Sequence, residues 1–473
     1  MEKEERDNFF QENNGEALNR FKSSLLSGRK SYFDISEFEE IVEHFLDEGD
    51  INASEIAARQ GMQIHPEAVE LQLKYAEVLL NQGKNEVALK HLNFIQKIDA
   101  NNPDVFLLRG VALLLLGDEE KAKKSFRRSL RYSGSDNDEI LHQIGNAYVQ
   151  AGKIDTAVQY FEEALTINPK NFSALEELGF FSDLEGNFQK SIDYYNRYLD
   201  IDPFNFSIWF NLGFSQSGAG NYEKAIEAYE YASLLNDKYT YALFNLGNAY
   251  ANAGKFSKAI EKYTEYLEFD PNNDDAWSYT GECYLNLEEH SRADYYYGKA
   301  LKINPENENA WFGKGLVKWI EKNWDESIAF MKKAIKYDKQ NSDYWVALAK
   351  VFNESNRIEE AEEAVVNASE LEPENAEVWL TWADILLKNN KLSAAVKTLK
   401  NGIKQSDSPL LKYRMVSLLL ESKKDKEAYE MLESAMQQDF TQIHFLYEIY
   451  PPAFKNRRLR KRVENFRKKS DQR

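Results

Sequence analysis

Histidine, cysteine and carboxylate side chains at characteristic spacings create most catalytic and metal sites. The histidines of this sequence show neither the HExxH pattern nor any other paired spacing. They are His44, His65, His91, His142, His290 and His444. A single cysteine, Cys283, excludes both a disulfide within the chain and a CxxC site. We therefore expect no catalytic residue and no metal site.

The sequence also lacks motifs for phosphate-binding loops, and its carboxylates do not indicate acid–base catalysis. The sequence has neither GxxxxGKS/T nor GxGxxG. Asp155, Glu223 and Glu326 stand at the starts of expected helices, where the positive helix end stabilises a carboxylate. Cys283 lies on the apolar side of an expected helix, which predicts an inert buried thiol. We expect no cofactor, no small-molecule substrate and no enzymatic activity.

The charge and hydropathy of the chain limit its partners. The 473 residues carry a net charge of −19, and phosphate binding needs clustered Lys and Arg, so nucleic acid is not expected on the body of the protein. No apolar run approaches the ~18 residues of a transmembrane helix. The N-terminal MEKEERDNFF is acidic, unlike a secretory signal. We expect a cytoplasmic protein.

Basic residues gather at the C-terminal end. Residues 455–473 hold ten basic and two acidic side chains, so this tail has a net charge of +8 and the rest of the chain −27. The run after IYPPAF predicts a helix with Leu459, Val463 and Phe466 on one side. We interpret it as a capping helix. An acidic partner, nucleic acid or anionic lipid on its basic side stays open.

The sequence repeats with a period of thirty-four residues. The segment LGNAYANAGKFSKAI at Leu246–Ile260 recurs as LGFSQSGAGNYEKAI at Leu212–Ile226 and as IGNAYVQAGKIDTAV at Ile144–Val158. Such a period is typical of stacked helical repeats. Glycines mark one position of the repeat at Gly110, Gly145, Gly179, Gly213, Gly247, Gly281 and Gly315.

Each repeat predicts two helices with a short polar break such as AGK between them. Leu243, Leu246 and Tyr250 share one face of a first helix. The central glycine or alanine lets the second helix approach closely. A proline such as Pro271 then ends the second helix, because its ring disfavours helix in the residue before it.

This pattern resembles the tetratricopeptide repeat family. The family's Trp, Gly, Tyr, Ala, aromatic, Ala and Pro marks are found at Trp277, Gly281, Tyr284, Ala293, Tyr297, Ala300 and Pro305. The resemblance implies an all-α fold, a right-handed superhelical solenoid of helix-turn-helix repeats whose first helices line the concave side. It covers residues 35–440, about twelve hairpins. Residues 1–34 are expected to be an acidic extension, partly helical or disordered, and residues 441–473 the capping helix and basic tail.

The family geometry places five positions of each first helix on the concave side. In the central repeats these hold aromatic, asparagine and acidic side chains: Asn146, Phe180, Phe210, Asn211, Phe214, Tyr241, Phe244, Asn245, Asn248, Tyr279 and Glu282. Exposed phenylalanines mark contacts, and asparagines can bond the main chain of an extended peptide. We therefore expect a non-enzymatic adaptor or scaffold that binds a peptide or protein partner in this groove. Alternatively, the aromatics pack against each other.

Two binding modes known in the family are not matched. Repeats that hold the C-terminal carboxylate of chaperones resemble each other in a Lys and Asn clamp, but here His142 stands in the Lys place beside Asn146, and Glu177 replaces the next Asn. The asparagine ladder of the repeat arm that feeds a sugar transferase is matched at Asn211 and Asn245 only in part. A chaperone tail is therefore disfavoured as partner.

Two other functions stay open. The chain could be the regulatory or substrate-holding arm of a separately encoded enzyme complex. It could instead be a scaffold that self-associates into a homo-oligomer through Tyr-rich second helices, around Tyr194, Tyr195, Tyr295 and Tyr296.

Overall fold

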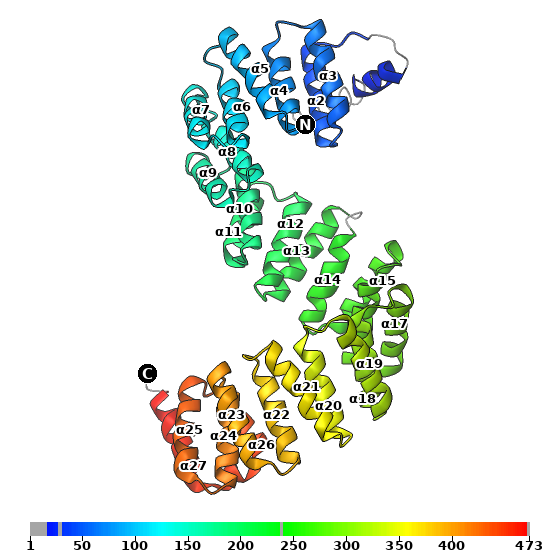
Figure 1. Ribbon diagram of the computed structural model, residues 1–473, viewed down its shortest axis with the longest axis vertical. Coiled ribbons are helices and arrows are strands. Elements are labelled where there is room, and N and C mark those ends of the chain that lie inside the picture. The colour runs from blue at the N-terminus through cyan, green and yellow to red at the C-terminus, as the bar shows by residue number, and fades with distance from the viewer. Residues whose placement is uncertain (1–16, 27–30, 237–239, 471–473) are drawn as a thin grey trace. The chain divides into compact units, whose positions relative to one another are not determined.

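The computed structural model describes residues 17–26, 31–236 and 240–470. These residues form helices and no strand, arranged as a succession of helical hairpins (Figure 1). The predicted all-α solenoid of helix-turn-helix repeats is thereby confirmed. The chain divides into two compact units, Met1–Asn236 (unit 1) and Asp237–Arg473 (unit 2).

Unit 1 is a stack of hairpins, each with an even-numbered first helix and an odd-numbered second helix. Its helices are α2 (Ile35–Asp47), α3 (Ile51–Ile64), α4 (Val69–Asn81), α5 (Asn85–Ile98), α6 (Pro103–Leu115), α7 (Glu119–Tyr132), α8 (Asn137–Gln150), α9 (Ile154–Ile167), α10 (Phe172–Leu184), α11 (Phe188–Leu199), α12 (Phe206–Gly218) and α13 (Tyr222–Leu235).

Unit 2 continues the same alternation and ends in three shorter or solitary elements. Its helices are α14 (Tyr241–Asn252), α15 (Phe256–Phe269), α16 (Asp274–Asn286), α17 (His290–Ile303), α18 (Glu308–Ile320), α19 (Trp324–Tyr337), α20 (Ser342–Glu354), α21 (Ile358–Leu371), α22 (Ala376–Lys388), α23 (Leu392–Ser406), α24 (Pro409–Glu421), α25 (Asp425–Gln438), α26 (Ile443–Ile449), η1 (Pro451–Lys455) and α27 (Arg457–Ser470).

Local sequence signals set where the first helices begin and end. An asparagine caps several of them, and its side-chain oxygen accepts a bond from a backbone N–H of the first turn. Asn171 accepts from Ala174 and Asn273 from Ala276 in this way. The turn after α14 has Gly254 at φ +72°, a left-handed conformation that side chains resist. These signals set the ends of the first helices that carry them.

In the six hairpins from α6–α7 to α16–α17, the central glycine of the first helix packs against an aromatic ring sixteen residues later. A Cβ on Gly145 would lie 2.3 Å from the ring of Phe161, and one on Gly247 would lie 2.6 Å from the ring of Tyr263. The sequence predicted that small residues let the helix backbones approach. The space is in fact filled by a ring from the second helix.

Equivalent side-chain hydrogen bonds join one hairpin to the next at two places in the array. Asp138, at the start of α8, accepts bonds from Asn168 and Asn171 in the connection before α10. In unit 2, Asp274 accepts the equivalent bonds from Asn304 and Asn307. Asp138 and Asp274 occupy the same position of the repeat, so in these two places the same bonds hold one hairpin in register with the next.

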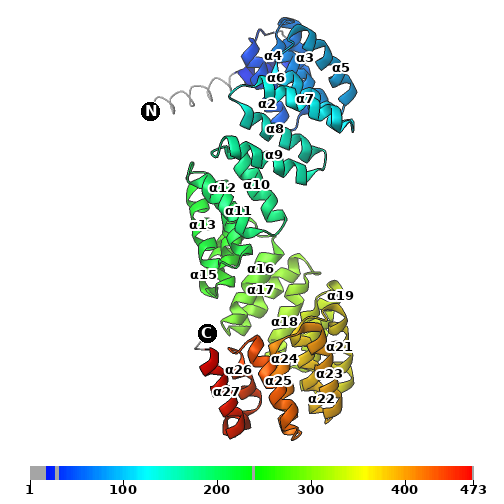
Figure 2. The ribbon, with the colours of Figure 1, turned by 90° about the vertical axis from the view of Figure 1, so that its left-hand side faces the viewer.

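Both ends of the repeat array are covered by apolar side chains. Phe21, in the helical segment 17–26, is fully buried and packs edge-on against Phe33, with ring centroids 5.7 Å apart. Residues 1–16 of the expected N-terminal extension lie outside the described residues. At the other end, α26 and α27 lie beside α24 and α25 (Figure 2). Leu459 of α27 is fully buried there.

Replacing Gly247 by alanine is expected to lower the free energy of unfolding by about 1–3 kcal/mol, because the new methyl group overlaps the ring of Tyr263. Gly298 is the matched control, since it lies inside α17 with no atom within 4 Å of an added Cβ. Gly298→Ala should stabilise the protein by about 0.5–1 kcal/mol. Urea unfolding followed by circular dichroism measures both. Equal effects of the two changes would contradict the ring contact.

Candidate functional site

The even-numbered helices form the inner face of each stack. In unit 1, α2 packs against α4, α4 against α6, α6 against α8, and α10 against α12. In unit 2, α16 packs against α18, and α20 against α22. Among the described residues, consecutive odd-numbered helices show no comparably close packing. Residues that face outward from the even-numbered helices therefore share one surface within each unit.

Three exposed apolar side chains lie on two neighbouring first helices of unit 1. Phe180 on α10 and Phe214 on α12 occupy the same position of successive hairpins and are 48% and 50% exposed. Leu184 lies one turn after Phe180 and is 68% exposed. We call Phe180, Leu184 and Phe214 the aromatic patch. Leu184 was missed in the sequence, although its i+4 spacing from Phe180 places it on the same helix face.

Two of the phenylalanines predicted for the groove instead pack against tyrosine rings of the helical hairpins. Phe210 of α12 is half-buried, and its ring centroid lies 5.5 Å from that of Tyr229. Phe244 of α14 packs against Tyr266 at 5.3 Å and against Tyr279 at 5.9 Å. For these two residues the packing alternative describes the structure better than an open groove does.

The predicted asparagines are partly engaged within the protein. Asn245 donates to the carbonyl oxygen of Tyr241, its own helix neighbour, at 3.0 Å. The Oδ1 atom of Asn248 accepts a bond of 2.6 Å from the hydroxyl of Tyr263. Asn211 is half-buried on α12. These amides therefore keep only some of their hydrogen-bonding capacity for a ligand.

Unit 2 has a hollow of about 290 Å³ that collects three of the predicted residues. Asn248, Tyr279 and Glu282 line it, and Cys283 contributes to its wall. Burial raises the pKa of Glu282, and burial beside Glu282 raises the pKa of Cys283 to about 12. The exposed ring of Tyr241 belongs to the same unit but does not line the hollow.

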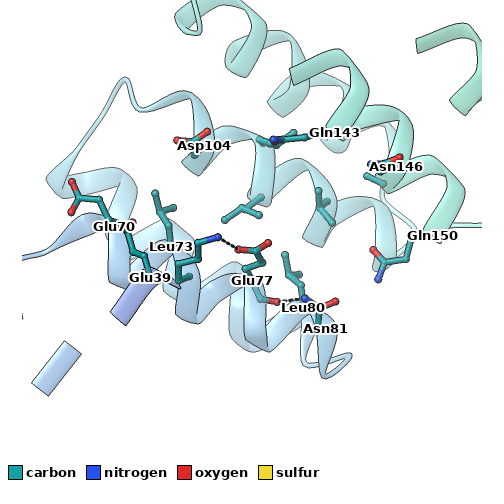
Figure 3. Close-up of a pocket in the computed structure, with 15 residues that line it drawn as sticks. Glu39, Glu70, Leu73, Glu77, Leu80, Asn81, Asp104, Gln143, Asn146 and Gln150 are labelled. Atoms are coloured by element: carbon teal, nitrogen blue, oxygen red, sulfur yellow. Dashed lines mark hydrogen bonds and ion pairs between the residues drawn. The ribbon is translucent and has the colours of Figure 1, made fainter. Parts of the chain in front are cut away.

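A larger cavity, of about 510 Å³, opens on α2, α4, α6 and α8 of unit 1 (Figure 3). We call it the acidic cleft. Of the predicted residues it contains Asn146, which lies on α8 beside Gln143 and Gln150. Its other lining residues are Glu39, Glu70, Leu73, Lys74, Glu77, Leu80, Asn81, Asp104, Leu107, Leu108, Val111 and Ala147.

The carboxylates of the acidic cleft were not predicted from the sequence. Glu70 and Asp104 are the second residues of α4 and α6 and stand thirty-four residues apart. That spacing equals the repeat period, so it indicates that the two carboxylates occupy the same position of successive hairpins. Their role was hidden because acidic residues at helix starts also have a purely structural explanation.

The described residues contain no group of three or more His, Cys, Asp or Glu side chains that could hold a metal ion. His142 is 9% exposed, with its ring 5.5 Å from that of Phe161, so it is a packed histidine. In the part of the chain that the structure describes, no helix is long and apolar enough to cross a membrane.

Two tyrosines expected on the surface of the second helices are buried. Tyr194 and Tyr195 of α11 are 7% and 1% exposed. The hydroxyl of Tyr195 donates to Asp183, and its ring fills the space beside Gly179. These two side chains therefore cannot meet a second copy of the chain, while Tyr295 on α17 remains exposed.

The basic C-terminal helix has two unlike sides. Leu459, Val463 and Phe466 pack against the last hairpins, and Phe466 stacks on Phe440 with centroids 5.4 Å apart. Arg462 forms an ion pair with Glu433 of α25. The other described cations of α27 are exposed: Arg457, Arg458, Arg460, Lys461, Arg467 and Lys468.

Three family profiles match this chain. The Cilia and flagella-associated protein 70 C-terminal domain matches residues 182–410. Tetratricopeptide repeat profiles match residues 142–206 and residues 103–136. These segments include α10 and α12, which carry the aromatic patch, and α6, which contributes to the acidic cleft.

Relatives and solved structures are similar over limited extents. BBSome complex member BBS4 from Bos taurus is 26% identical over 135 residues, which are 27% of this chain and 26% of that protein. The chain thus spans about a quarter of that curated relative. Yeast Tom70 is 14% identical over 90% of this chain and 98% of its own, with a TM-score of 0.47. MamA is 25% identical over 34% of this chain and 95% of its own, with a TM-score of 0.32.

The buried thiol gives a direct chemical test of the hollow. The pKa of Cys283 rises from an ordinary value of 9.0 to about 12, which reduces the reactive thiolate at pH 8 by roughly three orders of magnitude. Ellman's reagent should therefore label the native protein at least about a thousandfold more slowly than the same protein in guanidinium chloride. Equal labelling rates would show that the hollow opens to solvent.

Proposed function

Because the chain belongs to the tetratricopeptide repeat family, we propose that it is a non-enzymatic adaptor that holds a segment of a protein partner on the inner face of unit 1. The aromatic patch is the observation that carries this proposal. Phe180, Leu184 and Phe214 are exposed on α10 and α12, two first helices that pack against each other. Adjoining apolar side chains on a protein surface commonly mark an interaction site.

The expected energy of the contact is sufficient for a specific partner. Fully burying a phenylalanine or leucine side chain contributes about 1.5–3 kcal/mol, and these three are about half to two-thirds exposed. Covering them would thus contribute roughly 3–5 kcal/mol in total. Aromatic side chains dominate binding energy at interfaces in general.

Polar side chains next to the patch supply orientation. Glu177 precedes Phe180 on α10, and Asn211 precedes Phe214 on α12, each by one helical turn. Burial raises the pKa of Glu177, with the neighbouring Glu176 as the second cause. A carboxylate and an amide at this place can accept and donate bonds to the main chain of a bound segment.

The comparisons support a protein as the partner. The similar stretch of BBS4 belongs to a protein named as a member of the BBSome complex. We propose by extension that this chain also works within a protein assembly. It holds a partner in place and performs no chemistry on it.

A displayed library of random peptides can test the aromatic patch. Clones selected on the unaltered protein should lose most of their binding to the double variant Phe180→Ser, Phe214→Ser, because the apolar anchors are removed. A loss of at least about tenfold in affinity corresponds to 1.4 kcal/mol, well within the expected contribution. Phe210 and Phe244 are poorer choices, since their rings pack inside hairpins.

The matched control is the double variant Phe94→Ser, Phe269→Ser. Phe94 on α5 and Phe269 on α15 are 56% and 59% exposed but lie on odd-numbered helices. It should bind the selected clones like the unaltered protein, with both variants keeping their helical circular dichroism. Equal binding to the two double variants would remove the aromatic patch from the proposal.

A further inference from the structure

The acidic cleft is a second surface on the inner face of unit 1, with chemistry unlike that of the aromatic patch. Its floor is apolar, formed by buried or half-buried side chains such as Leu80, Leu107 and Val111. Carboxylates surround this floor from three helices: Glu39 on α2, Glu70 on α4 and Asp104 on α6 (Figure 3). An apolar strip bordered by like charges is therefore open to solvent.

The negative charge of the cleft is not neutralised from within. Lys74 is the only cation among its lining residues, and it pairs with Glu77 at 3.3 Å and with Glu43 at 3.6 Å. Among the described residues, no ion pair is made by Glu39, Glu70 or Asp104. Four lining carboxylates, those of Glu39, Glu70, Glu77 and Asp104, thus stand against a single ammonium group, for a formal net charge of −3.

Partial burial makes two of these carboxylates, those of Glu39 and Asp104, more costly to ionise. It raises the pKa of Glu39, with repulsion from Glu70 as the second cause. Burial also raises the pKa of Asp104, against a weaker opposing effect of Lys74. An incoming cation would relieve this cost, because an opposite charge nearby favours the ionised form of a carboxyl group.

We propose that the acidic cleft binds a basic segment of a partner protein, in which arginine or lysine side chains alternate with aliphatic ones. The aliphatic side chains cover the leucine floor, and the cations meet Glu39, Glu70 and Asp104. The amides of Gln143, Asn146 and Gln150 at the α8 end are placed to bond the main chain of the segment. This site is separate from the aromatic patch, so it goes beyond the function proposed above.

The dimensions of the cleft set the length of the segment. It extends over four first helices, α2, α4, α6 and α8, and packed helices lie about 8–10 Å apart. The span is then about 27 Å, which an extended chain covers with roughly eight residues at about 3.3 Å each. In an extended chain, alternate side chains point to opposite sides. Alternating aliphatic and basic residues would therefore separate the side chains for the apolar floor from those for the carboxylates at its border.

The probe is a fluorescein-labelled decapeptide of alternating leucine and arginine, measured by fluorescence anisotropy at low salt. A decapeptide of alternating leucine and glutamate is the charge control, and spermine tests whether a free polyamine suffices. We expect the leucine–arginine peptide to bind and the leucine–glutamate peptide not to bind. Binding should weaken at least about tenfold in 0.5 M salt, where screening shortens electrostatic interactions.

Two charge-reversal variants localise the binding. Glu70→Lys, Asp104→Lys changes the second residues of α4 and α6, and it should weaken binding of the leucine–arginine peptide more than tenfold. Glu86→Lys, Glu120→Lys makes the same change at the second residues of α5 and α7, where both side chains are exposed. This control has the same net charge and should keep the affinity within about twofold.

The double variant Glu70→Gln, Asp104→Asn removes the two charges without reversing them. It keeps the test possible if the charge-reversal variant does not fold, and it should also weaken binding of the leucine–arginine peptide. Equal losses in the cleft variants and the matched control would overturn the proposal, since attraction would then come from overall charge. Spermine binding as tightly as the peptide would overturn it too, because the site would be one for cations alone. Phe180→Ser, Phe214→Ser should leave this peptide bound, so failure of the cleft differs from failure of the aromatic patch.

Discussion

The packing of an aromatic ring against a glycine is the contact on which the six hairpins from α6–α7 to α16–α17 depend. Phe161 fills the space at Gly145, and Tyr263 fills it at Gly247. The ring holds the second helix against the middle of the first. The surfaces of the two helices that face each other are therefore buried. Stacking of the hairpins then buries the surfaces that each hairpin turns toward its neighbours. Only the outward sides of the helices remain for solvent or for a partner.

This division explains why both proposed binding surfaces lie on the even-numbered helices. Their outward sides lie next to one another from hairpin to hairpin, so one residue per helix is enough to build a patch from several helices. Phe180 and Phe214 show this for apolar side chains, and Glu70 and Asp104 show it for carboxylates. The repeat supplies the surface, while substitutions at fixed positions of the repeat supply the chemistry.

The fold was predictable from the sequence because its signals recur. The thirty-four-residue spacing of glycines, the polar breaks and the prolines all indicate the same hairpin, so agreement among repeats outweighs the ambiguity of any single one. The groove was predictable only in part. The sequence does not reveal that Phe244 contacts Tyr266 and Tyr279, because that contact depends on how far each ring tilts between hairpins. It equally hides which asparagines, such as Asn248, already bond a tyrosine.

Two surfaces of different chemistry on one inner face have a consequence for selectivity. An apolar patch alone would accept many exposed leucine and phenylalanine side chains, and an acidic cleft alone would accept many cations. Both lie in unit 1, so a partner with a basic segment and an apolar segment would engage the two together, and the second contact would form at a high effective concentration. Neither weak contact selects a partner by itself. A partner is selected because it carries both segments and makes both contacts. A repeat protein can in this way gain specificity without an enclosed pocket, since the covalent order of its hairpins fixes the order in which a partner must present its segments.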